Sequence, residues 1–283
     1  MRVCLLASGS RGNSTLIEAD NTRLLIDAGL SGKETQRRLA HLDLCCDDLD
    51  AILVTHEHHD HVGGIGPLAR RHHLPVYVDS RTCSALTQLG TIPQCCEFDA
   101  GDSFELNNLL ISSFSTTHDA INPVGFTIDS REGKVGYATD LGIATRLIAD
   151  RLQQCRVLVL EANHDEQMLI DSAYPWALKQ RIRSRHGHLS NEQACLLLDD
   201  IGWPGLEALF LAHLSAENNC TRLVSSLFQQ FVQNKDYRTQ VIVGSQSRVS
   251  ACFNDTGAVV TASDADQPFF NRKQDLTPRI LLG

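Results

Sequence analysis

Residues 51–64 read Ala-Ile-Leu-Val-Thr-His-Glu-His-His-Asp-His-Val-Gly-Gly, and they are the strongest indicator of architecture in the chain. The segment begins with apolar and β-branched residues, which predict a short buried strand. In an extended backbone residues i and i+2 share a face, so His56 and His58 can bind one metal ion, and Asp60 and His61, beyond the bend, can reach a second. Imidazole and carboxylate donors without a thiolate favour zinc or manganese. The alternative is a solvated histidine-rich loop, against which the apolar strand and the Gly-Gly pair argue.

The composition is that of an ordinary globular protein. The chain has 283 residues, of which 42% are hydrophobic and 21% charged, and this excludes a disordered or fibrous class. The formal net charge of −9 argues against a protein that coats nucleic acid, so a polyanion would need a local basic patch. We expect no membrane span and no signal peptide, because the apolar runs are too short. Ten cysteines without a signal then predict free thiols in the cytoplasm.

Strands and helices alternate along the chain. Short apolar runs between turn residues predict strands at 3–7, 15–19, 23–27, 51–55, 76–78, 109–114, 125–128, 134–139, 157–160, 208–212 and 241–243. Helical spacing predicts helices at 33–41, 145–153, 191–201 and about 216–232; Ser190 with Gln193 forms a capping box for the third, and Ser215 could cap the fourth. These elements indicate an α/β fold with two sheets covered by helices. We expect one domain over 1–262 and a loosely packed polar tail over 263–283.

The motif at 56–61 resembles the signature of the metallo-β-lactamase superfamily. Within it the chain is similar to the YycJ/WalJ-type hydrolases, which are exonuclease-like. The likeness also rests on segments 7–14, 139–142, 161–165, 187–191 and 213–219, so it covers about three quarters of the chain. The resemblance implies an αβ/βα four-layer sandwich, with two mixed sheets packed face to face and helices outside.

The resemblance also implies a full ligand set for two divalent ions, zinc or manganese. One ion is implied to bind His56, His58 and His118, and the other Asp60, His61 and His213, with Asp140 and a water bridging them. His118, Asp140 and His213 each follow a predicted strand in the expected order. Asp27 matches the first acidic motif of the superfamily, and its implied role is to orient the ligands by hydrogen bonds. A turn-forming aspartate before Ala28-Gly29 is the alternative for this position.

Three residues are implied to be catalytic: Asp60, His188 and Glu161. His188 and Glu161 are similar to the acid/base pair of the ribonuclease Z group, in which the histidine protonates the departing oxygen and the glutamate orients it. A phosphodiester leaving group is a poor one, so a general acid near pH 7 is useful. Helix capping for His188 and a strand-end hydrogen bond for Glu161 are the structural alternatives.

A basic run precedes the predicted acid. Lys179, Arg181, Arg183 and Arg185 occur without an acidic residue among them, and they could bind backbone phosphates on an otherwise acidic protein. A solvated charged face is the alternative. Further candidates for substrate binding are His164 in the segment 161–165, and Ser190 and Asn191 at the start of the third helix. The segment 9–14 could place amides near a phosphate or form a tight polar hairpin, and we favour the hairpin.

Together these features predict a dinuclear-metal phosphodiesterase. The implied reaction is attack of a metal-bridged hydroxide on phosphorus, in a 5′-to-3′ exonuclease-like enzyme whose substrate is DNA rather than RNA. The segment between Asp140 and His188 is too short for the extra domain of the β-CASP nucleases, and there is no long basic arm of the ribonuclease Z kind. An ester or thioester hydrolase of the glyoxalase II or lactonase kind is one alternative. A metal-stabilised regulatory protein without turnover is another.

Overall fold

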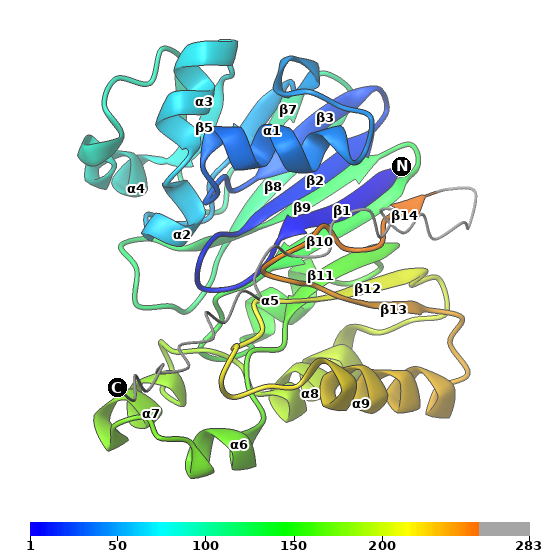
Figure 1. The fold of residues 1–283 in the computed structure, drawn as a ribbon. Helices are drawn as coiled ribbons and strands as arrows, with labels where there is room; N and C mark the ends of the chain where they lie inside the picture. The colour runs from blue at the N-terminus through cyan, green and yellow to red at the C-terminus, as the bar shows by residue number, and fades with distance from the viewer. Residues whose placement is uncertain (255–283) are drawn as a thin grey trace, which may run out of the picture.

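The computed structural model describes residues 1–254, which form two seven-stranded sheets packed face to face (Figure 1). Strands of the first sheet, in spatial order, are β14 (Phe253–Asn254), β1 (Arg2–Ala7), β2 (Ser14–Ala19), β3 (Thr22–Ile26), β4 (Ala51–Leu53), β5 (Val76–Asp79) and β6 (Cys95–Phe98). Those of the second are β13 (Gln240–Val243), β12 (Ala208–Ala212), β11 (Val157–Glu161), β10 (Gly133–Ala138), β9 (Val124–Ser130), β8 (Leu109–Ser115) and β7 (Ser103–Leu106).

Both sheets are mixed. In the first, β14, β1, β2 and β3 pair antiparallel, whereas β3, β4, β5 and β6 run parallel. In the second, β7 to β10 form an antiparallel meander and β10 to β13 run parallel. Parallel strands end at the same edge of a sheet, so the loops that follow them gather at one end of the molecule.

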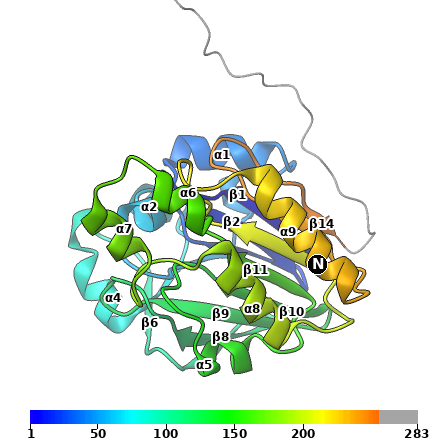
Figure 2. The same ribbon diagram turned by 90° about the horizontal axis from the view of Figure 1, so that it is seen from below.

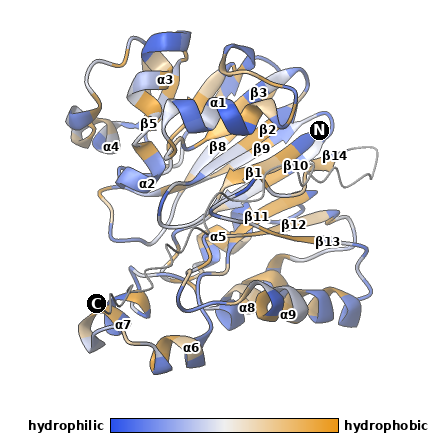
Figure 3. Ribbon diagram, in the orientation of Figure 1, coloured by the Kyte–Doolittle hydropathy of each residue, from blue (hydrophilic) through white to orange (hydrophobic). Residues whose placement is uncertain are grey.

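Strand alternation builds the layers. Val3 and Leu5 on β1 face the second sheet and pack in a core with Phe126 and Phe210, whereas Cys4 lies on the opposite face of β1, in the outer layer. Both faces of the sheets are therefore buried, which explains the short continuous apolar runs in the sequence. Figure 3 shows the hydrophobic colour concentrated on the strands and on the inner sides of the helices.

Helices cover both outer faces. The first sheet is covered by α1 (Gly32–Ala40) and α3 (Ile65–His72), and the second by α5 (Arg146–Arg151), α8 (Asn191–Ile201) and α9 (Thr221–Asn234) (Figures 1 and 2). Shorter helices lie in the loops: α2 (His59–Val62), α4 (Ser80–Ala85), α6 (Glu166–Asp171) and α7 (Trp176–Ile182), with 3₁₀ turns at Cys46–Asp48 and Thr87–Leu89. The predicted four-layer fold is confirmed, and none of the helices in residues 1–254 is long and apolar enough to cross a membrane.

The structure changes several predicted elements. The eleven predicted strands are present with small shifts of their ends, but β6, β7 and β14 were not predicted. The helix expected from about residue 216 begins at Thr221, because the Ser215 hydroxyl accepts the amide of Asn218 in a turn instead of capping the helix. The tail expected at 263–283 lies outside the described residues.

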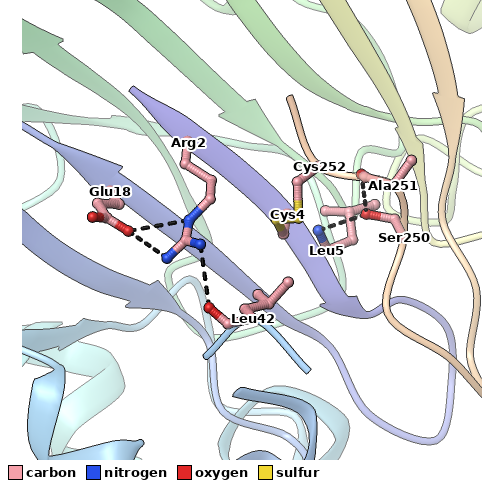
Figure 4. The surroundings of a disulfide bond; sticks show 8 residues. All are labelled: Arg2, Cys4, Leu5, Glu18, Leu42, Ser250, Ala251 and Cys252. Carbon is pink, nitrogen blue, oxygen red and sulfur yellow. Dashed lines mark hydrogen bonds and ion pairs between the residues drawn. A yellow bond between two sulfur atoms is a disulfide. The ribbon is translucent and has the colours of Figure 1, made fainter. Parts of the chain in front are cut away.

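The expectation of free thiols is wrong for two of the cysteines. Cys4 on β1 and Cys252, just before β14, form a disulfide over a sequence separation of 248 residues (Figure 4). Ser250 strengthens the same connection, since its Oγ accepts the amide of Leu5 at 3.0 Å. No local pattern in the sequence could indicate this pairing, because it depends on the antiparallel register of β14 with β1.

Candidate metal centre

The predicted metal-binding side chains all follow the carboxyl ends of strands. The loop after β4 carries His56 to His61, and the loop after β8 carries His118. Asp140 follows β10 and His213 follows β12, on either side of β11, whose last residue is Glu161. The edge that the parallel strands share therefore brings together residues that are far apart in the sequence.

Two of the predicted ligands, and Asp27 beside them, have an unusual backbone. Asp27, Asp140 and His213 follow β3, β10 and β12 with positive φ angles of 60°, 57° and 55°. Non-glycine residues adopt this conformation rarely, and at a cost, unless the surrounding structure holds them in place. The backbone therefore turns sharply directly after each of these strands, and the three side chains point into the same pocket.

Ligand atoms in this pocket form overlapping groups, each within 4.8 Å. The groups are His56 with His58 and His118, Asp60 with His61 and His213, His56 with His61 and Asp140, and Asp140 with Glu161, His188 and His213. The first two groups are the two triads implied by the resemblance, and Asp140 belongs to groups that contact both. Among residues 1–254, the buried atoms Oδ2 of Asp140 and Nε2 of His213 have no hydrogen-bond partner. A buried carboxylate oxygen and a buried imidazole nitrogen without hydrogen-bond partners are suited to bind a divalent cation.

His61 is oriented by Asp27. Nδ1 of His61 lies 2.7 Å from Oδ2 of Asp27, while its Nε2 faces Asp60 and Asp140 at 3.5 and 3.4 Å. Asp27 is itself fixed, since it accepts the amide and the hydroxyl of Thr55 at 2.9 and 2.8 Å. A carboxylate behind a histidine fixes the tautomer and leaves the other nitrogen for a metal.

His56 and His118 are held in a similar way. Nδ1 of His56 lies 2.9 Å from the Thr55 hydroxyl, and Nδ1 of His118 lies 3.1 Å from the carbonyl of Gly187. In both rings Nε2 is the nitrogen directed into the pocket: that of His56 is 3.1 Å from His58, and that of His118 is 3.7 Å from Asp140.

The pocket favours positive charge. Burial lowers the pKa of His61, but Asp140 and Asp27 outweigh it and raise that pKa to about 10. The pKa of His213 is raised well above its ordinary value against the same burial, first by the charge of Asp140 and then by the nearby carboxylates of Asp60 and Glu161. The pKa of Asp140 is held well below its usual range despite burial, because four histidines surround it. Buried carboxylates that stay ionised attract cations, as a site for divalent ions requires.

Glu161 and His188 form a pair beside this cluster. Oε1 of Glu161 lies 2.7 Å from Nδ1 of His188 and 3.1 Å from Nδ1 of His213, and its Oε2 accepts the amides of Leu141 and Leu189. Burial opposes ionisation of Glu161, yet the contact with His188 lowers its pKa to about 2. Glu161 is fully buried, whereas the His188 side chain is 20% exposed.

The expected substrate-binding residues do not form one patch. Lys179 is buried, and its ammonium donates to the carbonyls of Ile170 and Ser172, so its assignment to a phosphate-binding patch is corrected. The exposed Arg181 pairs with Asp119 at 2.6 Å and Arg183 with Glu166 at 2.9 Å, while Arg185 is exposed just ahead of His188.

Ser190 and Asn191 are also used within the fold. The Ser190 hydroxyl accepts the amide of Gln193 as the helix cap, and the Asn191 side chain exchanges hydrogen bonds with that of Asn219. Both are buried, which corrects their expected contact with substrate. His164 is buried as well, but neither of its ring nitrogens has a hydrogen-bond partner in the described part of the chain.

Asn13 contacts the centre although the sequence did not single it out. Its Nδ2 lies 3.1 Å from Oδ2 of Asp60 and 3.0 Å from Nε2 of His61, and its backbone amide donates to the carbonyl of Asp60. The segment 9–14 is therefore more than a polar hairpin, because it packs directly on the metal-binding loop. Its position in a segment that already carried the resemblance was the available signal.

Comparisons with known proteins agree with this geometry. Residues 22–214 match the family model of the β-lactamase superfamily domain. The chain is 38% identical to an exodeoxyribonuclease YycJ of Bacillus anthracis, over 82% of this chain and 89% of that protein. It is 34% identical to an exodeoxyribonuclease WalJ of Streptococcus pneumoniae, over 91% and 96%. Its fold is similar to the crystal structure of the metallo-β-lactamase fold protein YhfI of Bacillus subtilis, with a TM-score of 0.67 at 17% identity, covering 88% of this chain and 98% of that one.

Proposed function

This chain belongs to the metallo-β-lactamase superfamily, and we propose that it is a metal-dependent phosphodiesterase that degrades DNA from a 5′ end. Its likeness to exodeoxyribonucleases along most of both chains supports DNA as the substrate. The observation that carries phosphodiester chemistry is the His188–Glu161 pair beside Asp140. Hydrolysis of a thioester or an activated ester has less need of such a pair, because its leaving group departs without a proton donor.

The donor set fits two divalent cations, zinc or manganese. His56, His58 and His118 would hold one, Asp60, His61 and His213 the other, and Asp140 would contact both. When bound, such ions lower the pKa of a water and neutralise charge on a phosphate. Asp27 holds Nδ1 of His61, which directs Nε2 of the ring toward Asp60 and Asp140. The side-chain amide of Asn13 contacts both Asp60 and His61.

His188 is the proposed proton donor to the departing oxygen. The ionised carboxylate of Glu161 accepts a hydrogen bond from Nδ1–H of His188, and Nε2 of the ring then carries the proton that the substrate receives. Because Glu161 is fully buried, we infer that it acts on the reaction only by orienting His188 and His213. Arg185, on the exposed segment before His188, is the side chain that we assign to a substrate phosphate.

A substrate panel tests this function. Purified protein loaded with zinc or with manganese is offered duplex DNA with phosphorothioate caps on either the 5′ or the 3′ ends, single-stranded RNA, and a thioester. We expect digestion of DNA whose 5′ ends are open and none where they are capped, with loss of activity in a chelator. Cleavage of the thioester alone would contradict the proposal, and equal rates on the two capped DNAs would contradict its direction.

A further inference from the structure

A second group of metal-ligating side chains lies at the outermost strand of the first sheet, β6, and the proposed reaction does not use its residues. Cys83 comes from α4, while Cys95 and Glu97 come from β6, the last strand of the first sheet. The sulfurs of Cys83 and Cys95 are 3.3 Å apart, and one ligand atom from each of the three side chains lies within 4.8 Å of the others. None of these residues belongs to the histidine and aspartate pocket.

The strand geometry selects which groups face the cluster. Side chains alternate along β6, so Cys95 and Glu97 share one face and Cys96 lies on the other. Cys96 interacts with the hydroxyl of Tyr77 on the neighbouring strand β5. The adjacent cysteines therefore have different environments, and only Cys95 is directed toward Cys83 on α4.

The position of α4 against β6 is fixed by a buried carboxylate. Oδ1 of Asp79 accepts the amides of Arg81 and Thr82 at the start of α4, at 3.0 and 3.3 Å. Its Oδ2 accepts the amide of Ala100, two residues after β6, and the side chain of Asn122. Asp79 is 1% exposed, so this link belongs to the rigid part of the fold. The approach of Cys83 to Cys95 thus follows from the framework of helix and strand.

We propose that Cys83, Cys95 and Glu97 bind a soft divalent cation of the zinc class, separately from the catalytic centre. Cysteine thiolates and glutamate carboxylates are both zinc ligands, and three protein ligands leave one tetrahedral position for water. Binding releases the two thiol protons to solvent, two metal–sulfur bonds form, and no electron is transferred. Thiolates favour zinc, cobalt and cadmium over magnesium or manganese, so this site should reject manganese, which the imidazole and carboxylate donors of the catalytic centre can accept.

Cobalt(II) tests the site by a signal that the catalytic centre cannot give. Thiolate ligands produce an intense charge-transfer absorption with cobalt(II) in the near ultraviolet, whereas imidazole and carboxylate ligands do not. We expect this absorption when cobalt(II) is added to the reduced full-length protein, and its loss in Cys83→Ser and in Cys95→Ser. Cys96→Ser is the matched control, since it removes a thiol from the same strand but from its other face, and it should retain the absorption.

Zinc content gives an independent measurement. After dialysis against excess zinc, the variant with both Cys83→Ser and Cys95→Ser should hold one zinc ion fewer per chain than Cys96→Ser, with unchanged circular dichroism. Glu97→Gln should keep the cobalt absorption and weaken the affinity for zinc. No absorption in the reduced wild-type protein, or absorption that persists in both single serine variants, would overturn the proposal. Neither result bears on the nuclease activity, so this inference and the proposed function fail separately.

Discussion

Oε1 of Glu161 lies 2.7 Å from Nδ1 of His188, and only the histidine of this pair has exposed surface. Glu161 also accepts the amides of Leu141 and Leu189, which fixes its carboxylate at the end of β11. The orientation of His188 is therefore decided by a group that no substrate can reach. A reaction that uses His188 therefore depends on its buried hydrogen bond to Glu161.

His188→Ala should lower kcat on DNA by about 10²–10⁴-fold, the usual contribution of a positioned general acid. Bound metal should be unchanged, because His188 is not among the seven proposed ligands. Single-turnover rates with metal analysis measure both effects. His186→Ala is the control, since His186 is exposed two residues away and should retain activity. Unaltered turnover in His188→Ala would point to an ester or thioester substrate instead.

Asp27→Asn should weaken metal binding. The amide cannot replace a carboxylate that accepts from Thr55 at both oxygens and also contacts His61. We expect about 10–100-fold lower affinity, the usual effect of removing a partner behind a ligand, with activity partly recovered at high metal concentration. Competition with a chromophoric chelator measures this, with Asp50→Asn as a control outside the pocket. Equal affinities for the wild type and Asp27→Asn would remove the orienting role of Asp27.

Gly29→Ala should disturb the metal-binding loop. A Cβ at Gly29 would overlap the backbone of Asp60 and approach the amide of Asn13, so the segments must separate. Overpacking of this kind costs about 1–3 kcal/mol, and metal occupancy should fall with it. At Gly32, in α1, a Cβ would meet only Leu68 at 3.7 Å, so Gly32→Ala should be neutral. Urea unfolding measures the free energy of unfolding of both variants. Equal values for Gly29→Ala and Gly32→Ala would show that the contact of Gly29 with Asp60 and Asn13 leaves room for a side chain.

What could be predicted from the sequence was local. The motif at 56–61 and each apolar run of a buried strand consist of residues that are adjacent in the sequence, so they can be recognised without knowledge of the fold. β6 was missed because this edge strand has only four residues, Cys95–Phe98, of which only Phe98 is buried, so it leaves no apolar run in the sequence. Lys179 resembled its basic neighbours in sequence, and only the fold brings the carbonyls at the end of α6 to its ammonium. The contact of Asn13 with His61 likewise joins segments that no spacing rule relates.

Arg185→Gln should reduce the salt dependence of DNA binding. The backbone carbonyl of Arg185 packs against Gly142, two residues from Asp140, so the backbone of this exposed arginine lies near the centre. Loss of one phosphate contact should lower the slope of log affinity against log salt by about 0.9. Lys179→Met should leave that slope unchanged and instead destabilise the fold, by about 1–3 kcal/mol for unsatisfied buried carbonyls. Fluorescence anisotropy in a salt series tests the pair, and an equal slope in wild type and Arg185→Gln would remove the phosphate contact.

The Glu34 carboxylate predicts a pH-dependent contribution to stability. Hydrogen bonds from Arg37 and, against partial burial, from Arg38 lower its pKa from 4.5 to about 2. Arg38 also donates to the carbonyls of Leu6 and Gln246, so this network joins α1 to β1 and to the segment after β13. A pKa that is depressed in the folded state stabilises the protein fully above pH 4.5, and this stabilisation is lost as the pH falls toward 2.

Glu34→Gln should therefore be less stable than the wild type at pH 7, by less than about 1 kcal/mol because the pair is partly solvated. The difference should shrink between pH 4.5 and 2, where the wild-type carboxylate takes up its proton and the glutamine does not change. Guanidinium unfolding of both proteins across this range measures it, and other titrating groups cancel because both chains share them. A difference that stays constant as the pH falls would show that the Glu34 charge is not what stabilises the network.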